Sequence, residues 1–232
     1  MAEKIKYTRR DLKGPDEFFT SFGRAVAWGR ENRLRVGAGV LAVVALIALV
    51  LGTRAYLQWE ENRASRALWL QLNVARELLQ SPGEATAERL ASLEQSLGYQ
   101  INMHPKTKAA MYARYYLGSI AFLRGNYDLS ATQFRAGIDT GKAAGIMEYL
   151  LRQGFAEALE ARGDSAGAAA AYREAAGVAQ PDMKAQSMLG EARVLALSGK
   201  KTEAAALYRQ ILRESPETKS RDLIEIQLAQ LE

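Results

Sequence analysis

The chain has 232 residues, enough for one or two domains. It carries 31 Lys and Arg against 26 Asp and Glu residues, a formal net charge of +5. It has no cysteine and only one histidine, which disfavours disulfides and a transition-metal site. No motif of a zinc protease, a serine hydrolase or a complete phosphate-binding loop occurs. The sequence therefore predicts neither an enzyme, nor a cofactor, nor a small-molecule substrate.

Positive charge is concentrated at the N-terminal end. Residues 1–35 contain nine basic and five acidic residues, whereas the remaining chain contains 22 basic and 21 acidic residues. The later part has no basic stripe interleaved with aromatic residues, so we do not expect nucleic acid as a partner.

The first predicted helix lies within a basic tail, residues 1–35. Gly14-Pro15-Asp16-Glu17 is typical of a helix start, because proline suits the first turn and acidic side chains suit the positive end of the helix dipole. Phe18, Phe22 and Val26 follow at helical spacing, which predicts an amphipathic helix over about residues 15–30. Its apolar face can lie on the cytoplasmic membrane leaflet or on a cytoplasmic partner protein, and the sequence leaves both open.

Residues 36–53 predict a single transmembrane helix. The segment contains no charge and no proline, and as a helix it would be roughly 27 Å long, close to the thickness of the hydrocarbon core. A buried core helix would show a polar stripe, and a cleaved signal peptide would have a shorter apolar run and a small-residue cleavage site. We interpret the segment as an uncleaved signal anchor.

Orientation follows from the flanking charges. Basic residues stay on the cytoplasmic side, so the N-terminus is expected inside and residues 54–232 outside. In a bacterium this predicts an inner-membrane protein with a periplasmic C-terminal domain.

Residues 54–108 predict a long helix followed by a divergent helical repeat. No glycine or proline interrupts residues 55–80, so the span is expected to continue outward as one helix that Ser81-Pro82-Gly83 ends. A second helix is predicted over about residues 85–97, and residues 98–107 are predicted to form a loop in which His104 is exposed.

Internal repeats dominate residues 109–232. In the first copy, the Leu117-Gly118 pair allows two helices to approach closely, Gly125 makes the turn and Phe134 fills the space between the helices. The second copy has the turn glycine Gly163 followed by Tyr172, and the third has Gly199 followed by Tyr208. The turn glycines lie 38 and 36 residues apart, near the 34-residue period of tetratricopeptide repeats. Residues 218–232 predict an amphipathic capping helix.

The predicted fold class is therefore all-α, with one N-terminal transmembrane helix and a tetratricopeptide-repeat α-solenoid. A basic tail, one signal anchor and a domain of degenerate repeats resemble the YfgM-like family. This resemblance implies an ancillary subunit of the bacterial Sec translocon that also works with periplasmic chaperones.

The binding surface is expected on the inner face of the first helix of each repeat, which lines the concave side in this architecture. Counting back from the turn glycines places these positions at Tyr112, Tyr115, Ser119 and Phe122, then Leu150, Gln153, Glu157 and Glu160, then Gln186, Leu189 and Arg193. Repeats that hold a terminal carboxylate need Lys and Asn at such positions, so the tyrosines instead predict an amphipathic protein segment as ligand. Alternatively, Tyr112 and Tyr115 pack against the helices of residues 60–97 and face no ligand.

Two functions remain open at this point. The solenoid can be an interaction scaffold that binds other envelope proteins. It can also be a permanent structural or assembly subunit of another envelope complex, such as one for cell division or outer-membrane assembly. A permanent subunit would carry a large apolar patch, which distinguishes the two.

Overall fold

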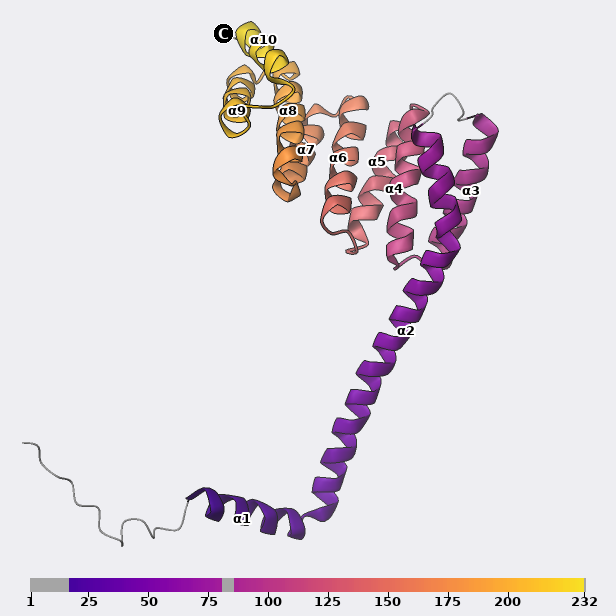
Figure 1. Cartoon of the computed structure of the whole chain (residues 1–232), viewed down its shortest axis with the longest axis vertical. Coiled ribbons are helices and arrows are strands. Elements are labelled where there is room, and N and C mark those ends of the chain that lie inside the picture. The colour runs from indigo at the N-terminus through magenta and orange to yellow at the C-terminus, as the bar shows by residue number, and fades with distance from the viewer. Residues whose placement is uncertain (1–16, 81–85, 232) are drawn as a thin grey trace, which may run out of the picture. The chain divides into compact units, whose positions relative to one another are not determined.

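A computed structural model describes residues 17–80 and 86–231, which form helices joined by turns and contain no strand (Figure 1). The first four helices are α1 (Glu17–Glu31), α2 (Arg33–Gln80), α3 (Ala87–Met103) and α4 (Lys108–Leu123). The remaining ones are α5 (Tyr127–Asp139), α6 (Ile146–Ala161), α7 (Ser165–Val178), α8 (Pro181–Leu197), α9 (Lys201–Glu214) and α10 (Arg221–Leu231). The chain divides into two units, one ending at Leu57 and the other beginning at Gln58.

The first unit contains α1 and the beginning of α2. A helix was predicted over about residues 15–30, and α1 confirms it, although the expected start at Gly14-Pro15-Asp16 lies outside the described residues. Asn32 alone separates α1 from α2, and its side chain donates a hydrogen bond to the carbonyl of Trp28 at 3.1 Å.

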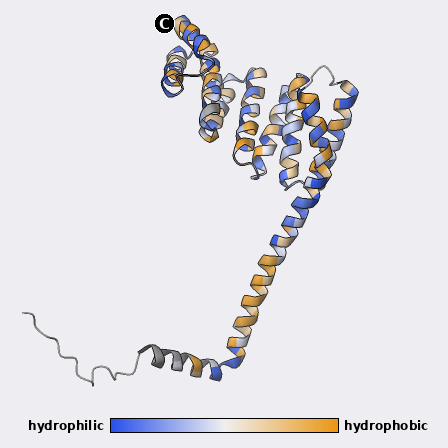
Figure 2. Cartoon of the chain, in the orientation of Figure 1, coloured by the Kyte–Doolittle hydropathy of each residue, from blue (hydrophilic) through white to orange (hydrophobic). Residues whose placement is uncertain are grey.

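Helix α2 contains the apolar segment predicted to span a membrane. Figure 2 shows this segment as a continuous hydrophobic stretch of the helix. Its most apolar 18-residue window has no buried residue, unlike a core helix, and α2 is long and apolar enough to be a candidate membrane span. The predicted continuation of the helix to Gln80 is confirmed.

The second unit begins with a small core shared by α2, α3 and α4. Ala64, Leu68, Ala75 and Leu78 recur at helical spacing on α2 and are buried against apolar residues of α3 and α4. Helix α3 corrects the sequence prediction, because it continues to Met103 where a loop was expected from residue 98. Its last turns are helical because Gln100 and Ile101 are buried.

The prediction that His104 is exposed was wrong. His104 is buried at the C-terminal end of α3, and its Nδ1 lies 2.6 Å from Oε1 of Glu60 on α2. The neighbouring Glu61 accepts a hydrogen bond from the backbone N–H of Lys108 at 2.9 Å, at the N-terminus of α4. Two adjacent carboxylates of α2 therefore fix the α3–α4 turn.

Three helix pairs follow in sequence, α4 with α5, α6 with α7, and α8 with α9, and each helix packs against the next. The turn glycines predicted from the repeats connect the two helices of each pair. Gly125, Gly163 and Gly199 have φ values of 73°, 89° and 78°, which L side chains rarely adopt. The repeat register is thus confirmed in all three copies.

Aromatic residues of the second helices fill the spaces between first helices. Phe134 of α5 lies between Gly118 of α4 and Gly154 of α6, where a Cβ atom would come within 2.9 and 2.6 Å of its ring. Tyr172 of α7 approaches Gly190 of α8 in the same way. The predicted role of Gly118 and Phe134 is therefore confirmed, and the structure adds Gly154 and Gly190.

Helix α10 packs on α9 at the C-terminal end of the solenoid. Ile224 is fully buried, and Leu228 and Leu231 pack partly against the main core. This confirms a helix within the segment predicted as a cap.

Candidate protein-binding groove

The predicted binding residues lie on α4, α6 and α8, the first helices of the three repeats. Helix α4 contacts α6 directly, so residues of neighbouring repeats meet on this side. Ser119, Phe122 and Glu157 come together in one cavity of about 180 Å³, whose other walls are Leu79, Leu123 and Phe134. We call this cavity the aromatic pocket.

Glu157 is the most unusual group of the aromatic pocket. Burial raises the pKa of its carboxyl above the ordinary value, and a hydrogen bond from Gln153 offsets this in part. Oε1 of Glu157 accepts that bond from Nε2 of Gln153 at 2.8 Å. Among the residues that the structure describes, no Lys, Arg or His forms an ion pair with Glu157. The pocket therefore contains a partly desolvated carboxylate that forms no direct ion pair within the described residues, although the more distant charge of Arg193 lowers its pKa slightly.

Gln153 positions Glu157. It is buried, and its Oε1 accepts a hydrogen bond from Oγ of Ser187 on α8 at 2.7 Å. Because both atoms of its amide group have partners inside the protein, Gln153 links α8 to the carboxylate of Glu157.

Glu160 and Arg193 form a pair one turn further along the helices. Arg193 donates two hydrogen bonds of 2.7 Å to Glu160, which also accepts one of 2.6 Å from the hydroxyl of Tyr172. Burial alone would raise the pKa of Glu160, but these bonds and the charge of Arg193 lower it overall. The charges of these two predicted binding residues thus neutralise each other.

The two predicted tyrosines differ in environment. Tyr115 packs against Tyr116 and Phe134, with ring centroids 5.2 and 6.0 Å apart, and burial raises the pKa of its hydroxyl. It therefore belongs in part to the core of the first repeat, while its neighbour Tyr116 packs on the core that α2 and α3 share. Tyr112 is 38% exposed and remains accessible.

Gln186 and Leu189 lie in a second and larger groove, which we call the C-terminal groove. Its volume is about 760 Å³, and the segment 214–220 and Ile224 form its opposite wall. Leu150 is half-buried against the main core. The predicted set therefore does not form one surface. Some members lie in the aromatic pocket, the Glu160–Arg193 pair or the C-terminal groove, whereas Tyr115 and Leu150 pack against the core and Tyr112 lines neither cavity.

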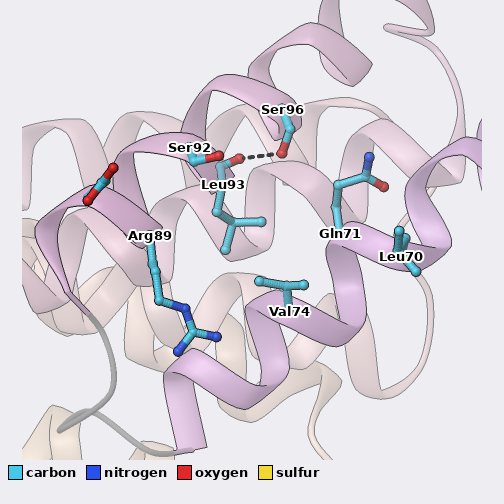
Figure 3. Close-up of a pocket in the computed structure, with 8 residues that line it drawn as sticks. Leu70, Gln71, Val74, Arg89, Ser92, Leu93 and Ser96 are labelled. Atoms are coloured by element: carbon cyan, nitrogen blue, oxygen red, sulfur yellow. Dashed lines mark hydrogen bonds between the residues drawn. The ribbon is translucent and has the colours of Figure 1, made fainter.

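Sequence reasoning missed a third groove between α2 and α3, the hairpin groove. It has a volume of about 510 Å³ and is lined by Leu70, Gln71, Val74, Glu88, Arg89, Ser92, Leu93 and Ser96. Figure 3 shows Val74 and Leu93 facing each other across it, with Arg89 at one end. The signal for it was present in the alternating apolar residues of α2, but its partner residues on α3 were not predicted.

The described parts of the chain contain no group of three or more His, Asp or Glu side chains arranged to hold a metal ion.

The family model described as tetratricopeptide repeat matches residues 154–217. These residues are similar to tetratricopeptide repeats. They include the second and third predicted copies and extend from the middle of α6 to just beyond α9. No curated protein matches the chain. The fold class is therefore an all-α tetratricopeptide-repeat solenoid with one long apolar helix near the N-terminus.

Proposed function

We propose that this protein is a membrane-anchored scaffold whose repeat domain binds segments of other proteins. The observation that carries the proposal is the aromatic pocket, where α2, α4 and α5 place apolar walls around the carboxylate of Glu157 on α6, which forms no ion pair among the described residues. Tetratricopeptide repeats stack to form extended binding surfaces, which supports protein partners in general.

The membrane anchor is the apolar part of α2, residues 36–53. The nine basic residues before it support a cytoplasmic N-terminus and a periplasmic repeat domain in a bacterial inner membrane. Fusions of alkaline phosphatase and of a cytoplasmic reporter to the C-terminal end test this topology. Only the phosphatase fusion is expected to be active, and the reverse pattern would disprove the orientation.

The partners we propose are envelope proteins, with the Sec translocon and periplasmic chaperones as first candidates because of the resemblance to the YfgM-like family. Mild crosslinking in membranes, affinity purification and mass spectrometry test this. Recovery of translocon subunits or chaperones with the full-length chain is expected. Recovery of cell-division or outer-membrane assembly proteins in their place would exclude this choice of partner.

The alternative is a permanent structural subunit of another envelope complex. Two exposed apolar residues of α2 favour it: Leu70 lines the hairpin groove and is 72% exposed, and Trp69, which precedes it in the chain, is 63% exposed. A permanent subunit would stay associated through extensive washing in mild detergent and would be unstable alone, whereas a scaffold that binds transiently would be washed free of its partner yet remain folded.

The proposal divides the chain into four segments. These are a cytoplasmic tail (residues 1–35), a membrane span (36–53), a long helix with a divergent repeat (54–108) and the repeats with their cap (109–232). No catalytic role is proposed for any of them, since function in this architecture resides in binding surfaces.

A further inference from the structure

The aromatic pocket is too small for an element of secondary structure. A helix with its side chains is about 10 Å in diameter, and even one turn of it would fill more space than the pocket volume of about 180 Å³. It can therefore hold one side chain of a bound segment.

The walls of the pocket define the chemistry of that side chain. Leu79, Phe122, Leu123 and Phe134 provide apolar surface that suits an aliphatic stem. The two polar groups, Ser119 and Glu157, both offer acceptors. The hydroxyl hydrogen of Ser119 is donated to the carbonyl of Tyr115 at 3.0 Å, which leaves its oxygen lone pairs for the pocket.

Glu157 adds a charge requirement. Its Oε1 already accepts from Gln153, and the nearby Arg193 is occupied by Glu160 at 2.7 Å. An ionised carboxylate that is desolvated without a counterion costs stability, and a glutamine of the same shape would avoid that cost. A complementary occupant thus has an apolar stem and a cationic donor at its end, which describes lysine and arginine.

We propose that the aromatic pocket binds the side chain of a lysine or arginine in a segment of the partner protein, with Glu157 as its counterion. This rests on the proposed function, because it names the residue type that the binding surface selects. The Gln153–Ser187 pair holds the carboxylate in place, and Phe122 and Phe134 line the pocket beside the aliphatic stem.

The test is selection of binding segments by the full-length protein in detergent from a phage-displayed library of random 12-residue peptides. Segments that bind the wild-type chain are expected to share a lysine or arginine at one position. Glu157→Gln should weaken binding of such a segment by about tenfold or more, because a desolvated charge pair is lost. The control Glu174→Gln, on α7 outside the pocket, should leave binding unchanged.

The outcomes distinguish the lysine or arginine assignment from the proposed scaffold function. Binders without a shared basic residue, or a basic preference that Glu157→Gln retains, would overturn the lysine or arginine assignment and leave the scaffold function intact. The variants Tyr112→Arg and Ser119→Arg test the proposed function itself. It would be contradicted if no peptide were selected, or if neither variant weakened binding of the selected peptides. Circular dichroism of the Glu157→Gln chain should match wild type, so that a loss of binding is not a loss of fold.

Discussion

Phe134 shows how single residues set the spacing of the repeats. Its ring lies between two glycines on different helices, so it cannot move away from either one. Replacing Gly118 with alanine would place a Cβ atom 2.9 Å from the ring. We expect Gly118→Ala to lower the free energy of unfolding by about 1–3 kcal/mol, and Gly118→Leu by more, through overpacking.

The matched control is Gly98→Ala, in the interior of α3, where a Cβ atom would meet no atom within 4 Å. This change should raise stability by about 0.5–1 kcal/mol, because alanine favours the helix over glycine. Thermal unfolding of the full chain, followed by circular dichroism, measures both. Equal stability of Gly118→Ala and wild type would contradict close packing at this position.

Glu157 gives a pH-dependent prediction. The pKa of the Glu157 carboxyl in the folded state lies above the ordinary value of 4.5, so the folded state holds the proton more tightly than the unfolded state. The protonated carboxyl therefore contributes its full stability below pH 4.5, and this contribution is lost as the pH rises through the folded-state pKa. Glu157→Gln should therefore melt at a higher temperature than wild type at pH 7, and the difference should shrink towards pH 4. A lower melting temperature of the variant at pH 7 would show that the carboxylate has a counterion in the folded protein.

The residues of the aromatic pocket show which contacts can be predicted from sequence and which cannot. The repeat register placed Ser119, Phe122 and Glu157 on facing helices, because turn glycines fix the phase of each copy. It could not place Leu79 in the same pocket, since that contact depends on how α2 packs. It also gave no sign that Glu160 and Arg193 satisfy each other, because the two lie 33 residues apart.

At the scale of elements, α2 holds the α3–α4 turn through two adjacent carboxylates. Glu61 accepts from the N–H of Lys108 at the positive end of α4 and lies 3.6 Å from the ammonium of Lys142. Removing it leaves the backbone N–H of Lys108 without its acceptor, so Glu61→Ala should destabilise the domain by about 1 kcal/mol.

The comparison variant is Glu77→Ala, on the same helix. Glu77 pairs with Arg89 at 3.0 Å, but both side chains are exposed, so its loss should change stability by less than about 0.5 kcal/mol. Melting temperatures of the two variants separate the cases. If Glu77→Ala costs as much as Glu61→Ala, the helix-terminus contact has no special role.

Helix α3 explains why one element boundary was wrong. Gly98 and the polar residues after it are typical of a loop, yet Gln100 and Ile101 are buried where α3 packs against α2 and α4. Tertiary contact overrode local propensity there. The boundary between the two helices of each repeat was predictable, because a glycine with positive φ forms the turn between them and its conformation does not depend on packing.

For the whole molecule, the two units carry different parts of the proposed function. The first contains the candidate membrane span, and the second contains the repeats, the aromatic pocket and the C-terminal groove. Composition and periodicity predicted the apolar segment and the repeats, because both signals can be read from residues that lie close together in the sequence.

Photo-crosslinking in living cells tests most directly whether the first helices of the repeats bind a protein. A photoreactive residue at Tyr112, which is accessible on α4, should form an adduct with a distinct envelope protein. The same residue at Ala170, which is exposed on α7, should form none. No adduct at Tyr112, or equal adducts at both positions, would contradict a binding surface on the first helices.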